Sequence, residues 1–462
     1  MARKIKNRGE VLAWSMYDFA NQPFTNIVVT FIYGTFFTTI VASDEISGTQ
    51  QWSHAVSVTA IIVALLSPIM GALADRGGYR KTFMFVFTWL TVVATTALYF
   101  VMPGEIFRAL FWFVIANVGF EMGAVFCNAY LPDISHSKNI GRISGYGWSL
   151  GYVGGLIALA LAMVLLVQTD TPVFGFEKGE ASAYENIRAT NLLVAVWFAL
   201  FSIPTFLFLR DRKPDKKALL KNVKHTLKDF RQTVKELRAY PQIMKFLLAR
   251  LVYNDGLVTI FAFGGIYAAG TLNFTFDEIM LMGIVLNVTA GLGSFLMGFL
   301  DDWVGGRMTI KVTLVGLMIA IVLAIAAPDL RPSLQYVLGG DAVPDFITGK
   351  NIFWIAAVLI GIFSGPNQAA SRSLMGRFTP EEKKNEFFGF FAFSGKATAF
   401  VGPFLFGVLT VLFESQRAGI FVIFFFFLIG FILLHKVNEN LGMEQGRSVC
   451  EGQKVEVNKP SS

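Results

Sequence analysis

Long runs of apolar residues recur along the chain and are separated by shorter polar segments. A helix needs about 20 mostly apolar residues to cross the ~30 Å hydrocarbon core of a bilayer. Runs of this length predict about twelve membrane-spanning helices, which lie near 11–41, 54–73, 82–102, 106–129, 143–167 and 190–209 in the first half and near 243–270, 276–300, 308–327, 351–375, 387–412 and 418–435 in the second. The pattern therefore predicts an all-α integral membrane protein.

One long polar and basic segment, Arg210–Tyr240, divides the chain near its midpoint. Apolar residues recur within it at helical spacing between lysines and arginines, which predicts an amphipathic helix on the membrane surface. A solvated linker with a helical stretch is the alternative. We expect four parts: an N-terminal six-helix half at 1–209, a cytoplasmic linker at 210–242, a C-terminal six-helix half at 243–436 and a polar cytoplasmic tail at 437–462.

Lysine and arginine are distributed unevenly between the two sides of the predicted bundle. Loops rich in these residues stay in the cytoplasm. With the N-terminus inside, the outer loops and their edges hold few of the 39 basic residues, namely Arg108, Lys178, Arg188, Arg331, Lys350 and Arg417. Both termini are therefore predicted to be cytoplasmic.

Composition narrows the class of protein. Only 15% of the residues are charged, against roughly 25% in soluble domains. Two cysteines and four scattered histidines offer no disulfide framework and no metal-ligand spacing, so we expect no cofactor and no metal. The basic residues behind the formal charge of +7 lie beside apolar spans, which favours contact with anionic lipid over nucleic acid. The first apolar stretch lacks an obvious cleavage site and is predicted to be a retained helix. A short chain without a targeting peptide suggests a bacterial inner membrane.

A short motif occurs once in each half. After the second predicted span the chain reads Gly71-Ala-Leu-Ala-Asp75-Arg76-Gly77-Gly78-Tyr79-Arg80-Lys81, and after the eighth it reads Gly298-Phe-Leu-Asp301-Asp302-Trp303-Val304-Gly305-Gly306-Arg307. Glycine, aspartate, glycine and arginine fall at matching offsets. The glycines permit a tight turn and close helix approach, and the aspartate and arginine can form charge-assisted contacts. Such a repeat is typical of transporters built from two like halves.

This motif resembles the signature G-x-x-x-D-R-x-G-R-R of the major facilitator superfamily. The resemblance implies a cytoplasmic gate motif formed by Gly71, Asp75, Arg76, Arg80, Asp302 and Arg307. It also implies the major facilitator fold, with the first, fourth, seventh and tenth helices around a central cavity. Tyr79 replaces a basic residue in the first copy, and Trp303 and Val304 depart from the signature in the second. We therefore expect the second copy to be the weaker gate.

A narrower resemblance is to the vacuole effluxer family within that superfamily. It is carried by segments in six predicted helices, Trp14–Asn21, Asn128–Ile134, Ser144–Gly155, Arg250–Gly256, Gln368–Leu374 and Phe387–Thr398. The resemblance implies a solute carrier, and the eukaryotic member of the family exports amino acids from the vacuole. It therefore implies a small polar organic solute, an amino acid or similar, as the cargo.

Ionisable side chains inside the predicted spans are few: Asp18, Glu121, Arg250, Asp255 and Lys396. Such residues are costly in a bilayer, so they face protein or a water-filled cavity and are functional candidates. With them we place the amides of the same spans in a predicted substrate or proton pathway: Asn21, Asn117, Asn254, Asn367 and Gln368.

In the first span, Asp18 and Asn21 are followed by Pro23. Proline frees a backbone carbonyl at mid-membrane depth, and broken helices commonly supply substrate contacts. Asp18 then serves either the site or polar contacts with the fifth helix or the gate. That fifth helix carries glycines at packing intervals, which predict close approach of another helix: Gly147, Gly151, Gly154 and Gly155.

Glu121 lies four residues beyond Asn117 on the fourth span, so the two share a helical face. A carboxyl group partly removed from water can exchange a proton near neutral pH. Glu121 is therefore our first candidate for proton coupling. A permanent salt bridge, to Arg142 or Lys396, is the alternative.

On the seventh span, Arg250 and Asn254 share one face, whereas Asp255 lies about 140° from Arg250. We therefore expect Arg250 and Asp255 to find partners on other helices. Arg250 or Lys396 can bind a substrate carboxylate. Alternatively, Lys396 neutralises Asp255 or Glu121 and holds the halves together.

In the tenth span, Gly365-Pro366-Asn367-Gln368 interrupts an apolar run. The proline predicts a kink. The two amides are either uncharged ligands in the cavity or partners in hydrogen bonds between helices.

The whole pattern predicts a secondary active transporter that works by alternating access and is coupled to protons. A non-transporting receptor or scaffold with the same fold is the alternative, and it would be expected to lose the gate motif or to gain a soluble domain. The sequence holds no nucleophile elbow, clustered histidines or phosphate-cradling G-x-x-x-x-G-K-[ST] loop, so we expect neither an enzyme nor an ATP-driven pump. The expected partners are the solute and membrane lipid, with no nucleic acid, and the expected oligomeric state is a monomer.

Overall fold

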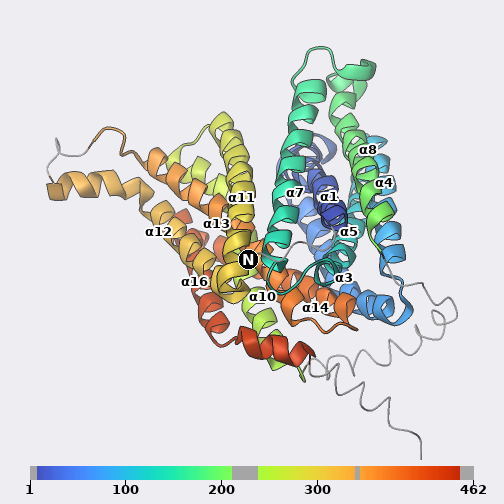
Figure 1. The fold of residues 1–462 in the computed structure, drawn as a ribbon. Coiled ribbons are helices and arrows are strands. Elements are labelled where there is room, and N and C mark those ends of the chain that lie inside the picture. The colour runs from blue at the N-terminus through green and yellow to red at the C-terminus, as the bar shows by residue number, and fades with distance from the viewer. Residues whose placement is uncertain (1–7, 211–237, 339–343, 448–462) are drawn as a thin grey trace, which may run out of the picture. The chain divides into compact units, whose positions relative to one another are not determined.

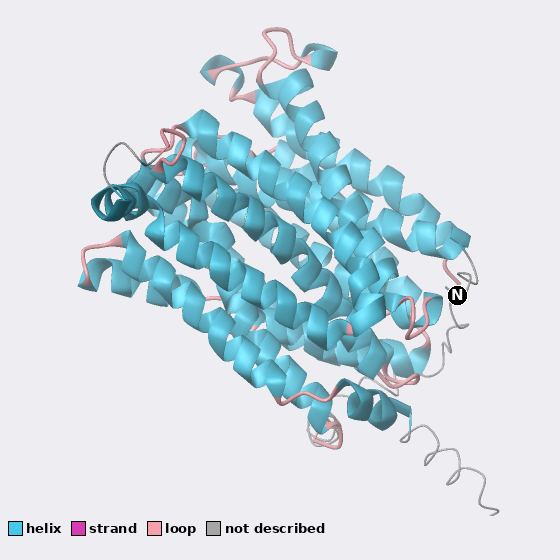
Figure 2. Ribbon diagram, turned by 60° about the vertical axis from the view of Figure 1, so that its left-hand side comes forward, coloured by secondary structure: helices cyan, strands magenta, loops and turns pink. Residues whose placement is uncertain are grey.

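The computed structural model describes residues 8–210, 238–338 and 344–447. Every regular element in those ranges is a helix (Figure 2). Twelve of the described helical segments are long and apolar enough to cross a membrane. This confirms the prediction of an all-α protein with twelve spans. The amphipathic helix predicted within Arg210–Tyr240 falls outside the described residues for positions 211–237.

The first six spans are formed by the elements that Figure 1 colours from blue to green. The chain runs through α1 (Arg8–Pro23) with the π-helical η1 (Phe24–Phe31), α2 (Tyr33–Phe36) and the π-helical η2 (Phe37–Val41), then α3 (Glu45–Gly77), α4 (Arg80–Tyr99), α5 (Ile106–Asn128) with the short α6 (Leu131–Ile134), α7 (Ile140–Ala162) with the π-helical η3 (Met163–Val167), and α8 (Glu185–Phe208). Several helices extend into polar residues beyond the predicted apolar run, as α3 does at both ends, so the apolar runs underestimate helix length.

The last six spans follow in the same manner. They are α10 (Pro241–Leu272), α11 (Phe276–Val304), α12 (Gly306–Leu338), α13 (Gly349–Phe378), α14 (Lys384–Lys396) with α15 (Val401–Leu412), and α16 (Gln416–His435). A short helix at 439–447 follows α16. The run predicted as one helix at 387–412 is thus two helices separated by a turn at 397–400. The helix predicted at 308–327 continues through Pro328 and Pro332 to Leu338.

Local chemistry sets several of the helix ends. Asp44 caps α3, because its Oδ1 accepts a hydrogen bond of 2.9 Å from the Ser47 amide. Thr275 and Glu278 form a reciprocal capping box at the start of α11. The motif glycines Gly78 and Gly305 end α3 and α11 with φ of 68° and 92°. Left-handed backbone of this kind favours glycine, which accounts for the matching offset in the two copies of the motif.

The described residues form two compact units. The first comprises 8–136, 150–210 and 379–393, and the second comprises 137–149, 238–338, 344–378 and 394–447. Most of α14, up to Phe393, therefore belongs with the early helices, and the start of α7 belongs with the late ones. This division differs from the expected halves in those two segments.

In the first unit, α4 packs on α5 and α8, α1 packs on α8, and α3 packs on α5. Its interior is rich in aromatic side chains that are fully buried, such as Phe24, Tyr33 and Phe113. In the second unit, α13 packs on α11 and α12, and α10 packs on α16. Many large apolar side chains of both units point outward, as they do where lipid tails are the solvent.

Candidate functional site

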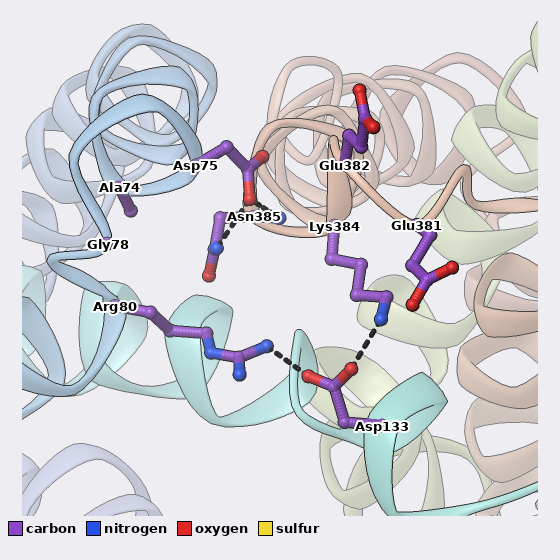
Figure 3. A pocket seen from close by; sticks show the side chains of 9 residues that line it. All are labelled: Ala74, Asp75, Gly78, Arg80, Asp133, Glu381, Glu382, Lys384 and Asn385. Carbon is purple, nitrogen blue, oxygen red and sulfur yellow. Dashed lines mark hydrogen bonds and ion pairs between the residues drawn. The ribbon is translucent and has the colours of Figure 1, made fainter. Parts of the chain in front are cut away.

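The aspartate of the first motif copy lies at the start of another helix. Asp75, near the end of α3, accepts hydrogen bonds from the Asn385 amide at 3.1 Å, from Asn385 Nδ2 at 2.7 Å and from the Glu386 amide at 2.8 Å. The first amides of a helix lack partners within that helix, and the helix dipole attracts negative charge there. Asp75 therefore caps the N-terminal end of α14 (Figure 3).

The arginine of the first copy serves a second contact nearby. Arg80, at the start of α4, donates to Asp133 Oδ2 at 2.6 Å and to the Ala129 carbonyl at 3.0 Å, and its guanidinium lies 3.6 Å from the centre of the Tyr130 ring. Lys384 of α14 forms an ion pair with the other oxygen of Asp133. Arg80, Asp133 and Lys384 line a small cavity of about 50 Å³ together with Asp75 and Asn385. Figure 3 shows these five side chains. The Asp133 carboxylate thus joins α4 to α14.

The second motif copy makes the same main-chain contact with a different helix. Asp302, near the end of α11, accepts hydrogen bonds from the Gly141 amide at 2.8 Å and the Arg142 amide at 3.3 Å. The Arg142 side chain also donates from Nε to Asp302 Oδ2 at 2.5 Å. Asp302 therefore caps the N-terminal end of α7, as Asp75 caps α14. The second copy forms this contact in full, despite its departures from the signature.

Additional charges surround the second copy. Asp301 is paired with Arg377 Nη1 at 2.5 Å, and both side chains are at most 3% exposed. Glu439, in the segment after α16, accepts hydrogen bonds from the Gly306 amide at 3.2 Å and the Arg307 amide at 2.9 Å. Arg307 donates to the main-chain carbonyls of α16 instead of an acid. The arginines of the two copies thus have different partners.

Glycines let the paired helices of each crossing touch. A Cβ atom on Gly71 would overlap the backbone of Asn385, and one on Gly389 would overlap the backbone of Ser67. In the second crossing, a Cβ on Gly298 would lie 2.9 Å from Arg142 Cα. Ser67 precedes Gly71 by four residues, as Ser294 precedes Gly298. The repeat therefore extends one helical turn further than the motif indicates.

A second group of predicted residues forms a polar cluster in the second unit. Arg250 Nη1 donates to Ser394 Oγ at 2.9 Å, and Asn254 Nδ2 donates to the Gly395 carbonyl at 2.9 Å. Asp255 Oδ1 accepts from Thr398 Oγ1 at 3.1 Å. All three contacts reach the place where α14 ends and the turn before α15 begins. Arg250 thus has a partner on another helix, as the spacing predicts, whereas the partner of Asp255 lies in the turn that follows that helix.

The two amides of α13 differ in their contacts. Gln368 Nε2 donates to Asn254 Oδ1 at 3.2 Å, which adds Gln368 to the polar cluster. Asn367 is fully buried and donates to Thr313 Oγ1 of α12 at 2.9 Å. Asn367 therefore serves packing between helices, the second of its two predicted roles. Lys396, the last residue of α14, is partly exposed.

The predicted residues of the first unit lie on α1 and α5. The helix changes from α to π form directly after Pro23, which follows because proline removes an amide donor and clashes with the preceding turn. Asn21 and Asn117 are 5% and 7% exposed, whereas Asp18 and Glu121 are partly buried. Asp18 lies against Gly151 of α7, at 3.5 Å from Asp18 Cβ to an added Cβ. The glycine face of α7 thus packs on α1, as predicted.

Several charged residues of the crossings were not among the predicted site residues. Five of them lie far from the motif in sequence, namely Asp133, Arg142, Arg377, Lys384 and Glu439, and Asp301 lies within the second motif copy. Asp133 could have been identified from the sequence, because it lies in Asn128–Ile134, one of the segments that carry the family resemblance. Among the described residues, no group of three or more His, Cys, Asp or Glu side chains could hold a metal ion.

Sequence comparison identifies the family of this chain. A family model for the vacuole effluxer Atg22 and like proteins matches residues 45–447. The MFS-type transporter YxiO of Bacillus subtilis, which is uncharacterised, is 29% identical over 433 residues, covering 92% of this chain and 94% of that protein. Autophagy-related protein 22 of Yarrowia lipolytica is 22% identical over 479 residues, covering 87% and 76%.

Solved structures show the same fold at low sequence identity. The proton:xylose symporter XylE has a TM-score of 0.70 at 11% identity, covering 96% of this chain and 98% of that one. The E. coli fucose:proton symporter FucP has a TM-score of 0.67 at 13% identity, covering 94% and 100%. The chain therefore belongs to the Atg22-like vacuole effluxer family and is a multi-pass membrane transporter with the major facilitator fold.

Proposed function

We propose that this protein is a secondary active transporter that moves a small polar organic solute, an amino acid or similar, across a bacterial inner membrane by proton-coupled alternating access. Its two six-helix halves have both termini in the cytoplasm in this proposal. The family supports the transport function, and the basic residues in the predicted inner loops support the orientation. The polar cluster around the break between α14 and α15 carries the proposal.

The substrate contacts in this proposal come from that cluster. Arg250 is 7% exposed and supplies a guanidinium beside Ser394, and the amides of Asn254 and Gln368 lie next to it. A planar guanidinium suits a carboxylate, and amides suit the other polar groups of an amino acid. Helices broken at membrane depth commonly offer free backbone groups to a substrate. Lys396, at the same break, carries a second positive charge.

Asp255 is the proton-coupling group that the contacts favour. It is 3% exposed, its carboxylate accepts a hydrogen bond from Thr398, and no ion pair to it occurs among the described residues. A buried carboxylate without a cation is costly inside a membrane, and proton uptake removes that cost. A change in water access between two conformations would then bind and release the proton. Glu121, the first candidate from the sequence, becomes the second candidate in this proposal.

The two helix crossings supply the gate in this proposal. Opening on the cytoplasmic side requires α14 to leave Asp75 and α7 to leave Asp302. Each contact is a charge-assisted main-chain hydrogen bond that can form and break as a unit. XylE and FucP are proton symporters with the same fold, which supports proton coupling in this proposal.

Transport in proteoliposomes tests the proposal. Purified protein is reconstituted and assayed for counterflow and for gradient-driven accumulation of a panel of amino acids, short peptides and organic acids. We expect one panel member to exchange in counterflow and to accumulate only with an imposed proton gradient. Asp255→Asn should abolish accumulation but keep counterflow, because exchange needs no net proton movement. Arg250→Gln should lose both activities.

Matched variants separate the two acids. Glu121→Gln tests the second candidate under the same conditions, and Thr398→Val removes the Asp255 hydrogen bond without removing its carboxyl group. Accumulation that persists in Asp255→Asn and fails in Glu121→Gln would move the coupling role to Glu121. Accumulation by the wild type that does not depend on the imposed proton gradient would refute proton coupling. Failure of every panel member to move would favour the receptor or scaffold alternative.

A further inference from the structure

A cavity near the second motif copy has a volume of about 620 Å³ and lies between the start of α12, the end of α11 and the segment after α16. It is separate from the polar cluster at the break of α14 and α15. Its wall holds five basic side chains and three acidic ones. The balance of charge in the cavity is therefore positive.

The three acids of the wall already have partners. Asp301 is paired with Arg377, Asp302 is paired with Arg142, and Glu439 accepts the first amides of α12. Arg377 is already paired with Asp301 in the same group of contacts. The acids therefore do not neutralise the remaining basic residues of the wall.

Four cations of the wall have no carboxylate partner among the described residues. Arg307 donates only to main-chain carbonyls, and Lys311 Nζ lies 2.9 Å from His435 Nδ1. Lys138 and Arg447 are exposed and form no hydrogen bond or ion pair with the described part of the chain. Their converging positive charges make a site for a phosphate group.

The rim of the cavity shows which kind of phosphate fits. Trp303 is 84% exposed and Met308 is 51% exposed, and both line the cavity. Exposed apolar side chains continue from them along α11 and α12, including Leu296 at 65% and Ile319 at 52%. Such helix surfaces face acyl chains in a bilayer, and an exposed tryptophan at a helix end lies at headgroup level. A free phosphate has no group that uses this apolar rim.

We propose that this cavity binds the phosphodiester headgroup of an anionic phospholipid, with Lys138, Arg307, Lys311 and Arg447 around the phosphate and the acyl chains along Trp303 and the outer face of α11 and α12. A bound lipid would add a removable counter-charge beside the Asp302 crossing. Basic pockets between helices on the cytoplasmic side are suited to such headgroups. The site is independent of the solute that the protein carries.

Quenching of Trp303 by brominated lipid tests the proposal. The full-length protein in detergent micelles is titrated with phosphatidylglycerol or phosphatidylcholine that carries brominated acyl chains, and the difference between wild type and Trp303→Phe isolates the signal of this residue. We expect quenching at Trp303 to favour phosphatidylglycerol. Lys138→Gln/Arg447→Gln should reduce that preference by about 25-fold, from roughly 1 kcal/mol for each basic residue. Both replaced side chains are exposed, so the fold should be retained.

The chain offers a matched control. Arg238→Gln/Lys245→Gln removes one arginine and one lysine from exposed positions of the same unit that do not line the cavity, and it should leave the preference unchanged. Inorganic phosphate at matched ionic strength should not reduce the quenching. Equal loss in the control pair, an unchanged preference in the Lys138/Arg447 pair, equal quenching by the two lipids, or displacement by inorganic phosphate would each overturn the proposal.

Discussion

The α3–α14 crossing and the α11–α7 crossing use one device in two settings. In both, an aspartate near the end of one helix accepts the first amides of the other, and glycine four residues earlier removes the side chain between them. The glycine that ends the helix carrying the aspartate, Gly78 for α3 and Gly305 for α11, has positive φ in both copies. The shared part of the two crossings is therefore main-chain geometry.

The ion pairs around that shared part differ. The second copy has Asp301 where the first has Ala74, and Asp301 forms a buried pair with Arg377. In the first copy the ion pair involves Arg80 and Asp133, whose side chain is 35% exposed. Buried pairs are far more sensitive to loss of one partner than exposed ones. The repeat thus preserves the helix cap, while the energetic cost of losing a charge should be greater in the second crossing.

The largest expected effect comes from breaking the buried pair of the second crossing. Arg377→Gln leaves Asp301 charged, 2% exposed and without its main partner. Removal of one partner of a buried ion pair costs about 3–5 kcal/mol. We expect a marked drop in the temperature at which the detergent-solubilised protein loses its monodisperse peak in size-exclusion chromatography.

The double variant Arg377→Gln/Asp301→Asn provides the control, because it removes both charges at once. It should recover most of the lost stability, since a neutral pair leaves no uncompensated charge. Equal melting temperatures for the single and double variants would contradict the role assigned to the pair.

The extent of prediction from sequence differs between main-chain and side-chain features. The twelve spans follow from runs of apolar residues, and the spacing of Gly71 and Asp75 and of their repeat predicts a close helix approach at each motif copy but not which helix approaches. Both are local patterns set by the bilayer and by backbone sterics. The break at 397–400 lies in a continuous apolar run, so hydropathy could not reveal it. Its contacts with Asn254 and Asp255 depend on the tertiary structure.

The charged residues that contact the motif could not be predicted from the sequence for a related reason. Arg377, Lys384 and Glu439 lie on helices or segments that only the fold brings to the motif, and each resembles an ordinary charge at a helix end. Asn367 shows the opposite case, because its two possible roles were visible and only the contact with Thr313 distinguishes them. The sequence pattern therefore predicted which polar residues lie within the spans, and the packing of the helices determined which residues they contact.

The next effect tests the shared helix cap in each crossing separately. Asp75→Asn removes the charge that accepts the amides of Asn385 and Glu386, and hydrogen bonds to charged groups contribute about 1.5–3 kcal/mol. Hydrogen exchange measured by mass spectrometry should accelerate by tenfold or more in peptides that contain these amides. Asp302→Asn should accelerate exchange at Gly141 and Arg142 instead. Acceleration at the same peptides in both variants would show that the crossings do not act separately.

A smaller effect is expected from the glycines. Gly71→Ala places a methyl group against the backbone of Asn385, which cannot move as a side chain can. Overpacking of this kind costs about 1–3 kcal/mol. Gly298→Ala meets Arg142 Cα at 2.9 Å and should cost somewhat less. Melting of the two variants in detergent checks the order, and a larger loss in Gly298→Ala would reverse the comparison.

The smallest effect should come from Lys384 in the first crossing. Asp133 is 35% exposed and keeps Arg80 as a partner when Lys384 is replaced. Lys384 makes this contact with a partly exposed carboxylate, and ion pairs near the surface contribute about 0–1 kcal/mol, so Lys384→Gln should change the melting temperature little. Arg80→Gln should cost more, because Arg80 is buried against the Tyr130 ring and also donates to the Ala129 carbonyl. Melting curves of the two variants, measured in parallel, test this order. A larger loss of stability in Lys384→Gln would indicate that α14 is held by its ion pair more than by the Asp75 cap. Main-chain hydrogen bonding would then not be the feature that the two crossings share.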